Sequence, residues 1–258
     1  MSQSFSILCS DVIETIQLPN PQEKILPGIA WGRFQDFFTP AYWYTQAWVS
    51  EKRGFHDSQR LGTSLLEELA ICLLGGYGMV AEHGLAAFEQ LRGYGFFSGR
   101  LPSEEEIMRI LQTPLYIGGR QVHYRYPRQR SKYLYQAIKR LKGEEPPKSS
   151  DREFRNWLMS FNGIGPKTAS WITRNWLNSD NIAIIDIHIQ RSGMIIGLFG
   201  PHLNPSKDYF EMEKRFLNFA SAIRVRASVL DAVIWSHMRM MKKIALRVSK
   251  DVHAYMLN

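Results

Sequence analysis

The sequence contains only two cysteines, Cys9 and Cys72, among 258 residues. They lie far apart and neither belongs to a Cys/His cluster, so the sequence supports no zinc or iron–sulfur site, and we expect two buried free thiols. No run of about eighteen apolar residues occurs, which argues against a transmembrane helix. The N-terminus has no basic start and too short an apolar run for a signal peptide. We therefore expect a cytoplasmic protein that does not contact a membrane.

Acidic residues are also fewer than basic residues. Lys and Arg number 32 against 24 Asp and Glu, which gives a net charge of +8 and a pI near 9.5. Such an excess suits a polyanionic partner, either nucleic acid or an anionic membrane surface. Many basic proteins bind neither, so charge alone does not decide. Hydrophobic residues make up 45% of the chain, enough to bury a sizeable core.

Strand signals are missing as well, because no pair of alternating apolar and polar runs is evident. Residues 18–48 are rich in Pro, Gly and aromatics and predict an ordered, irregular arm with a helix beginning near Pro40. Apolar residues at helical spacing then predict helices through most of the chain from residue 61 onward. The spacing of two Ser/Glu pairs is typical of capping boxes: Ser103 with Glu106, and Ser150 with Glu153. The sequence therefore predicts a nearly all-α fold.

We expect three parts along the chain. Residues 1–60 form an N-terminal arm that packs on the helical core. Residues 61–192 form a helical lobe, and a polar linker, EEPPKSS, lies within it before residue 151. Residues 193–258 supply C-terminal helices that complete a second lobe with the N-terminal part.

The stretch FNGIGPKTASWITRNW, residues 161–176, predicts a tight helical hairpin within residues 150–177, because apolar residues recur at helical spacing on both sides of it. Gly163 and Gly165 let the backbone turn sharply and approach another surface closely. Pro166 suits the first turn of the second helix, whose free N–H groups and positive dipole end favour a phosphate. An ordinary corner between two helices has the same pattern, so the glycines alone leave both interpretations open.

These residues, together with the later run IAIIDIHIQR, resemble the helix–hairpin–helix DNA glycosylase superfamily. The shared features are the glycine hairpin, the amphipathic helix and an Asp that ends an apolar run; here Asp186 follows Lys167 by 19 residues. The resemblance covers residues 150–192 closely and the helices from Leu61 to Leu141 loosely. It implies an all-α helix–hairpin–helix glycosylase fold, with two helical lobes and a cleft between them.

The resemblance also implies a mechanism. The target nucleotide flips out of the duplex, the Lys167 amine attacks the sugar C1′ to form a Schiff base, and β-elimination nicks the strand. Asp186 is implied as the catalytic carboxylate and His188 as a contact to the phosphate of the flipped nucleotide. The residues themselves leave other interpretations open. Lys167 could be a solvated first-turn lysine, Asp186 a helix N-cap, and His188 a structural histidine.

The target base is inferred from the C-terminal third. It has no cysteine, which argues against the relatives that carry an iron–sulfur cluster there, and the 8-oxoguanine glycosylase group remains the best match. Compact prokaryotic members of that group carry a pattern that reads LDAVIW here, which implies a base pocket containing Asp231 and Trp235. An Asp in the first helical turn and a core Trp would give the same pattern. Trp171 stands where eukaryotic enzymes have a cysteine facing the base, so this pocket is expected to differ.

We therefore expect a monomeric enzyme that acts on double-stranded DNA, with phosphate contacts from the glycine hairpin, Lys167, His188, Arg128 and Arg130. No cofactor is expected, although a structural monovalent cation at the hairpin stays open. One alternative is the same chemistry on another modified base, as in defence against phage DNA. The others are a non-catalytic helix–hairpin–helix module that binds nucleic acid, and a purely structural role.

Overall fold

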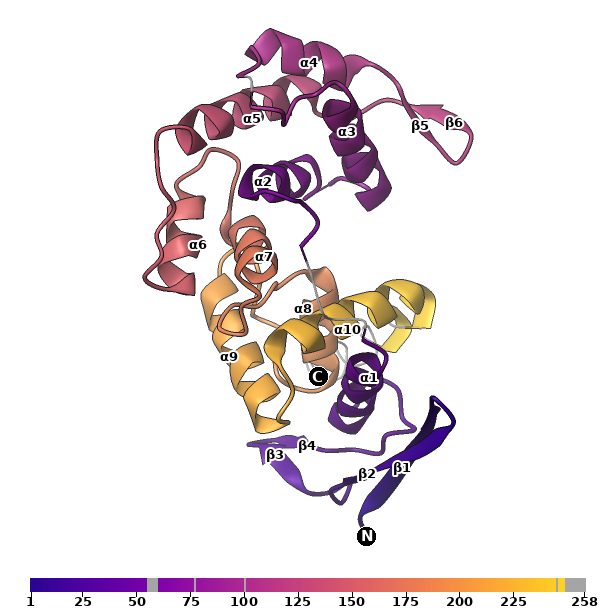
Figure 1. Ribbon diagram of the computed structural model, residues 1–258. Helices are drawn as coiled ribbons and strands as arrows, with labels where there is room; N and C mark the ends of the chain where they lie inside the picture. Colours follow the sequence, from indigo (N-terminus) through magenta and orange to yellow (C-terminus); the bar gives the residue numbers. More distant parts are fainter. Residues whose placement is uncertain (55–59, 77, 100, 245, 249–258) are drawn as a thin grey trace. The chain divides into compact units, whose positions relative to one another are not determined.

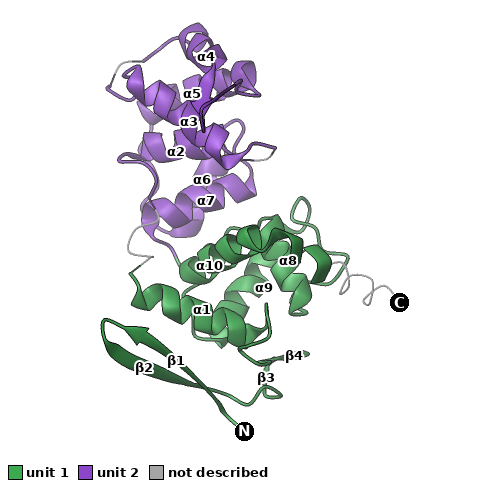
Figure 2. Ribbon diagram, turned by 90° about the vertical axis from the view of Figure 1, so that its right-hand side faces the viewer, with its two compact units in different colours: residues 1–58, 180–258 green, residues 59–179 purple. Residues whose placement is uncertain are grey.

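The computed structural model describes residues 1–54, 60–76, 78–99, 101–244 and 246–248, and the chain divides into two compact units. Unit 1 contains residues 1–58 and 180–258, whereas unit 2 contains residues 59–179 (Figures 1 and 2). The division differs from the expected boundary at residue 192. It falls before Asp180 because the run that follows, including Ala183 and Ile185, is buried in the core of unit 1.

Unit 1 joins the N-terminal arm to the last helices of the chain. Its elements are β1 (Gln3–Cys9), β2 (Val12–Leu18), β3 (Lys24–Leu26), β4 (Ile29–Ala30), α1 (Pro40–Lys52), α8 (Ile187–Ile195), α9 (Tyr209–Ala222) and α10 (Ala227–Met240). The helix expected near Pro40 is confirmed as α1, with Thr39 as its N-cap.

The first two strands correct the expectation that strand pairs are absent. β1 and β2 form an antiparallel hairpin paired from Gln3 with Leu18 to Cys9 with Val12. The half-buried face of β1 includes the polar Gln3, and its exposed face includes the apolar Leu8. Because a polar residue lies on the half-buried face and an apolar residue on the exposed face, the strand lacks the regular apolar–polar alternation by which strands are recognised in sequence. Cys9 lies in this strand half-buried, so the expectation of two buried thiols is wrong for Cys9 and confirmed for Cys72.

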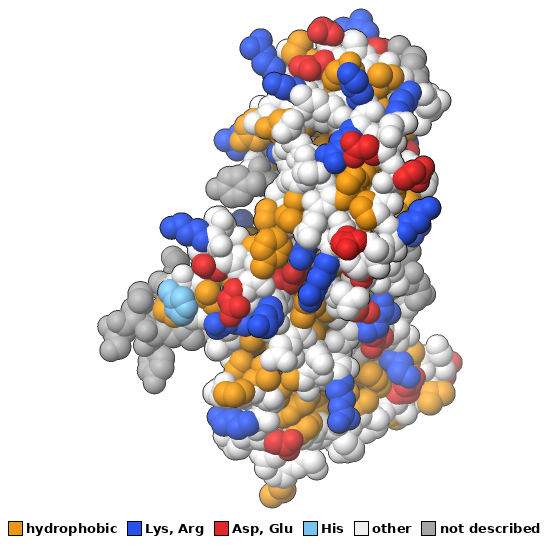
Figure 3. Space-filling model, turned by 90° about the vertical axis from the view of Figure 1, so that its left-hand side faces the viewer, with side chains coloured by type: hydrophobic (Ala, Val, Ile, Leu, Met, Phe, Trp, Pro, Cys, Tyr) orange, Lys and Arg blue, Asp and Glu red, His pale blue; other side chains and the backbone are white. Residues whose placement is uncertain are grey.

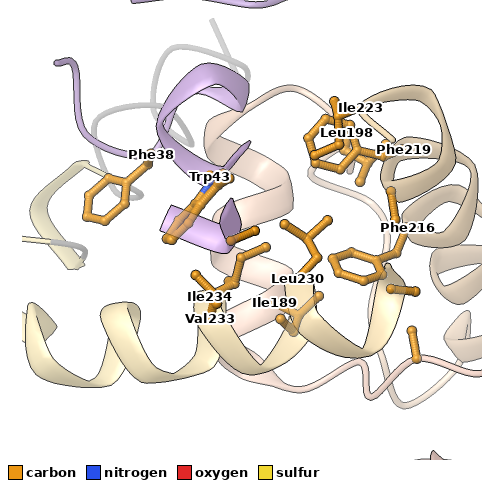
Figure 4. Packing of buried hydrophobic residues seen from close by; sticks show 14 of the residues in the cluster. Phe38, Trp43, Ile189, Leu198, Phe216, Phe219, Ile223, Leu230, Val233 and Ile234 are labelled. Carbon is orange, nitrogen blue, oxygen red and sulfur yellow. The ribbon is translucent and has the colours of Figure 1, made fainter. Parts of the chain in front are cut away.

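The core of unit 1 shows why the N-terminal arm is rich in aromatics. Phe38 and Trp43 are fully buried and their rings lie 5.7 Å apart. They pack in one cluster with Ile189 of α8, Phe216 of α9 and the apolar face of α10 (Figure 4). The arm is therefore part of the hydrophobic core of this unit.

Unit 2 is built mainly of helices around its own core. Its elements are α2 (Leu65–Leu74), α3 (Ala81–Gly93), α4 (Glu104–Gln112), β5 (Leu115–Ile117), β6 (Arg120–Val122), α5 (Pro127–Leu141), α6 (Asp151–Met159) and α7 (Pro166–Leu177). Ser103 and Ser150 cap α4 and α6 as predicted, each accepting the backbone N–H of the Glu three residues later. Strands β5 and β6 form a further antiparallel hairpin, which the sequence did not predict. In the described part of the chain, none of the helices has the length and apolar character that a bilayer crossing requires.

A buried carboxylate on α2 connects this helix to the segment before it and to α7. Glu68 is fully buried, and its Oε2 accepts the N–H groups of Leu61 and Gly62 at 2.7 and 2.9 Å. Its Oε1 accepts the Asn175 side-chain amide at 2.7 Å. Gly62 has no room for a side chain, because a Cβ there would lie 2.5 Å from the Glu68 nitrogen. Three donors therefore depend on one side chain of α2.

Glu68→Gln should destabilise the protein. The amide has one acceptor oxygen in place of two, so buried N–H donors lose their partner at a cost of about 1–3 kcal/mol. Urea unfolding of purified protein measures the loss. Glu145→Gln, at an exposed loop position of the same unit, should leave the unfolding free energy unchanged. Equal stability of the two variants would contradict the role of Glu68.

Candidate active site

The α6–α7 hairpin turns through a glycine that no other residue could replace without strain. Gly163 has a φ of +83°, and a Cβ placed on it would lie 2.2 Å from Cδ2 of Tyr133 on α5. Beside it, the Asn162 side-chain amide donates to Oε1 of Gln136, also on α5, at 2.9 Å. The hairpin is thus fixed against α5 by ring contact and by a hydrogen bond.

The second glycine of the hairpin leaves space in front of α7. Gly165 is the N-cap of this helix, is exposed, and has no atom within 4 Å of an added Cβ. Pro166 follows as the first helical residue, as predicted, and the first turn contains no acidic side chain. The N–H groups of Lys167 and Thr168 have no partner within the helix. The start of α7 therefore has the backbone groups and the open approach that an anion site requires.

Lys167 lies half-buried in the first turn of α7. The ammonium group stands at the positive end of the helix dipole, a place where helices favour acids. It also lies close enough to α2 to act on Cys72: burial and Glu68 raise the pKa of this thiol well above its ordinary value, whereas Arg174 and Lys167 oppose that shift. Lys167 is therefore not a fully solvated surface lysine.

Trp171 lies one turn after Lys167 on the same face of α7. Its indole ring is half-buried and lies 3.7 Å from the position that a Cβ would take on Gly75, at the C-terminal end of α2. Lys167, Trp171 and Cys72 thus belong to one region of unit 2, where α7 packs on α2.

Asp186 is the N-cap of α8 in unit 1. Its Oδ1 accepts the N–H groups of His188 and Ile189 at 2.8 and 3.0 Å, and the side chain is half-buried. The cap interpretation of Asp186 is therefore confirmed. The two bonds use one oxygen and fix the direction of the carboxylate.

Side chains of α9 and α10 hold the segment before Asp186. Buried Asp231 accepts the Ile184 N–H at 3.2 Å through Oδ2, so this carboxylate supports the loop that ends at Asp186. Two neighbouring bonds act in the same way: Ala183 N–H to Glu213 Oε1 at 3.1 Å, and Ile185 N–H to the Tyr209 hydroxyl at 3.2 Å.

Trp235 is not the core tryptophan that the helical pattern allowed, because 40% of it is exposed. The His188 ring stands edge-on to it with centroids 6.4 Å apart, and the Arg239 guanidinium lies 5.1 Å from the ring centroid. Arg239 was not among the predicted site residues, and its spacing of four from Trp235 places both on one helix face. An aromatic surface flanked by two basic side chains therefore lies beside α8.

The two predicted phosphate contacts on α5 differ in exposure. Arg128 is exposed in the first turn, whereas Arg130 is half-buried. Arg130 lies 5.9 Å from the Tyr133 ring centroid and close to Tyr124, where burial raises the pKa of the phenol and Arg130 acts against that rise. Arg128 is thus the better placed of the two for an external anion.

The predicted site residues fall into two groups. In unit 2 the structure brings Gly163, Gly165, Lys167 and Trp171 to α7, and in unit 1 it brings Asp186, His188, Asp231 and Trp235 to α8 and α10. Within the described ranges, no group of three or more His, Cys, Asp or Glu side chains is arranged to hold a metal ion.

The chain is similar to known proteins. A family model described as 8-oxoguanine DNA glycosylase matches residues 50–225, which include both hairpin glycines and Asp186. The 8-oxoguanine DNA glycosylase/AP lyase of Korarchaeum cryptofilum is 30% identical over 185 residues, covering 69% of this chain and 82% of the relative.

Two solved structures are also similar. The crystal structure of the 8-oxoguanine DNA glycosylase of Thermotoga maritima has a TM-score of 0.53 at 26% identity and covers 76% of this chain and 88% of its own. The 8-oxoguanine glycosylase/lyase of Methanocaldococcus jannaschii, solved with a 15mer DNA containing 8-oxoguanine, has a TM-score of 0.50 at 25% identity. That match covers 74% of this chain and 87% of the other.

Gly163→Ala should destabilise the hairpin, because the methyl group meets the Tyr133 ring and the backbone is left-handed. We expect a loss of about 2–4 kcal/mol in the free energy of unfolding. Gly165→Ala is the matched control, since its φ of −92° and open surroundings accept a methyl group at a cost below about 1 kcal/mol. Chemical denaturation of both variants tests the difference, and equal losses would contradict it.

Proposed function

The chain belongs to the 8-oxoguanine DNA glycosylase family, and we propose that it is a bifunctional glycosylase and AP lyase that removes 8-oxoguanine from double-stranded DNA. The observation that carries the proposal is the half-buried Lys167, which lies in the first turn of a helix entered through an open glycine hairpin. Asp186, the N-cap residue of α8, supplies the carboxylate of the family pattern.

DNA binding in this proposal begins with the backbone. The N–H groups at the start of α7 bind a phosphate, and Gly165 lets the phosphate approach because no side chain stands in front of it. Exposed Arg128 and half-buried His188 add further phosphate contacts. Such contacts set the register of the protein on the duplex and do not read the base.

Lys167 is the proposed nucleophile. Once the damaged nucleotide has flipped out of the duplex, the Lys167 Nζ lone pair attacks C1′, the bond from C1′ to the base nitrogen breaks, and the base leaves with a proton. The C1′–O4′ bond of the sugar then breaks, a proton from the attached nitrogen passes to O4′, and a C1′=N double bond forms, which is the Schiff base. Loss of a proton from C2′ then breaks the C3′–O bond and cuts the strand on the 3′ side. Hydrolysis of the Schiff base returns the free lysine.

Asp186 has an electrostatic role and a proton-accepting role in this mechanism. Its carboxylate stabilises the positive charge that develops as the bond to the base breaks, and it accepts a proton from the attacking amine. The hydrogen bonds donated by the backbone N–H groups of His188 and Ile189 hold the Asp186 carboxylate in one orientation, so little reorganisation is needed during the reaction. Capping and catalysis are therefore compatible roles.

The base is bound by the aromatic side chains in the proposal. The exposed face of Trp235 is available to stack on a flipped purine, and Trp171 lies one turn from the nucleophile. Asp231 contributes by holding Ile184, and through it the loop that leads to Asp186.

The relatives named above act on 8-oxoguanine, which supports that base as the substrate. Trp171 is the observation that favours the second candidate, the same chemistry on another modified base. Duplexes carrying 8-oxoguanine or other modified bases separate the two, because the first candidate predicts the fastest excision of 8-oxoguanine.

Borohydride trapping tests the nucleophile. Wild-type protein with duplex DNA containing 8-oxoguanine should give a covalent protein–DNA adduct, and Lys167→Gln should give none, because the glutamine amide cannot form a Schiff base. Lys214→Gln, at an exposed position of α9, is the control and should trap like wild type. Trapping by Lys167→Gln would exclude Lys167 as the nucleophile.

Two substitutions of Asp186 separate its chemical role from its cap. Asn caps a helix as well as Asp does, so Asp186→Asn should keep thermal stability and slow excision by about 100-fold or more. Asp186→Ala should lose both the activity and about 1 kcal/mol of stability. Single-turnover excision and thermal unfolding are measured on the same preparations. Unchanged excision by Asp186→Asn would contradict the chemical role of Asp186, whereas wild-type protein that binds DNA without excising any base would favour a non-catalytic DNA-binding module.

A further inference from the structure

The β5–β6 hairpin presents side chains that none of the roles above uses. Gly118 and Gly119 form its turn, both with positive φ. Leu115 is buried at its base, whereas Tyr116, paired across the strands with Gln121, is 77% exposed. Figure 1 shows the hairpin projecting from the helices of unit 2. Among the exposed aromatic side chains of the described residues, that of Tyr116 has the largest exposed fraction.

The hairpin lies in the longest stretch of this chain that contains no acidic residue, and that stretch is basic. Between Glu106 and Glu144, residues 107–143 contain no Asp or Glu and nine Lys or Arg: Arg109, Arg120, Arg125, Arg128, Arg130, Lys132, Lys139, Arg140 and Lys142. The rest of the chain contains 23 Lys and Arg against 24 Asp and Glu. On the face drawn in Figure 3, basic and acidic side chains are intermingled. The excess positive charge of the chain is therefore concentrated around this hairpin and the helix after it.

Contacts within unit 2 connect the β5–β6 hairpin to the α6–α7 glycine hairpin. After β6, Arg125 donates to the Gly78 carbonyl at 3.1 Å and its guanidinium lies 5.0 Å from the Tyr126 ring centroid. α5 begins at the next residue but one, and two turns later Tyr133 packs against Gly163. The path from Arg120 to the phosphate-binding turn is thus one continuous basic segment of fixed structure.

We propose that the β5–β6 hairpin is a second point of contact with the DNA duplex, where Arg120, next to the turn, pairs with a backbone phosphate and the ring of Tyr116 packs on the DNA. The charge of the segment and the exposed ring both fit a nucleic-acid backbone, since phosphates attract arginine and aromatic rings pack on sugars and bases. The proposal rests on DNA being the substrate of this protein, and it extends the contact beyond the α6–α7 hairpin.

Equilibrium binding to undamaged duplex DNA tests the proposal without requiring excision. Arg120→Gln should weaken binding by about threefold to tenfold near 0.1 M salt, and should lower the slope of log Kd against log salt by about 1, the value for one phosphate contact. Lys214→Gln, which removes the same charge from α9, should change neither quantity. Identical salt slopes for wild type and Arg120→Gln would overturn the phosphate contact.

The ring contact is tested separately. Tyr116→Ala should weaken binding by about threefold or more without changing the salt slope, and Tyr116→Phe should restore it, because stacking needs the ring and not the hydroxyl. Unfolding curves for all variants should coincide with wild type, since Tyr116 and Arg120 are exposed. Binding by Tyr116→Ala equal to wild type would exclude the ring contact.

Duplex length distinguishes direct contact from an indirect effect. As the duplex is shortened from either end, wild type should lose affinity in a step when the DNA no longer reaches the hairpin. Arg120→Gln, which already lacks the contact, should lose that step. A step of equal size in both proteins would contradict the proposal. If wild type binds DNA with these features but excises no base, the proposed function fails and the hairpin contact stands.

Discussion

The close approach of Gly163 to the Tyr133 ring is the constraint on which the candidate site depends. No side chain fits between the turn and α5, and the backbone is left-handed at this point. Packing against Tyr133 therefore fixes where the α6–α7 turn lies on α5, and this in turn fixes where α7 begins. Because Lys167 is only four residues further on, the location of the amine in unit 2 is set by a glycine and by a ring from a different helix.

The far end of α7 is held as firmly as its start. Asn175 is bonded to the buried carboxylate of Glu68, and the Trp176 carbonyl accepts two bonds from Arg60. In unit 1, the cap on α8 and the bonds from α9 and α10 hold Asp186 equally closely. Each of the two proposed reacting groups is thus fixed by the packing of its own unit, the arrangement that precise active sites require.

Most of the helices and the family could be predicted from local signals. Ser103 and Ser150 marked helix starts, and the glycine hairpin with Lys167 and Asp186 resembled a family whose model matches the chain. The catalytic roles of Lys167 and Asp186 stay predictions. The strands could not be found, because Gln3 faces inward and Leu8 outward. The part played by Tyr133 was also missed, since a contact between residues thirty apart depends on tertiary packing. The base pocket stays a prediction, and Asp231 and Trp235 lie beyond the matched range.

Unit 1 is assembled from both ends of the chain, with the whole of unit 2 between them, and this has a consequence for synthesis on the ribosome. Phe38 and Trp43 are made early, but the helices that bury them come after the 121 residues of 59–179. At about 5–20 residues per second, that interval lasts from several seconds to tens of seconds. Unit 2 can complete its core during this time, whereas the aromatic arm must wait with its rings in water. The arm is therefore the segment most in need of protection by a chaperone while the chain is being made.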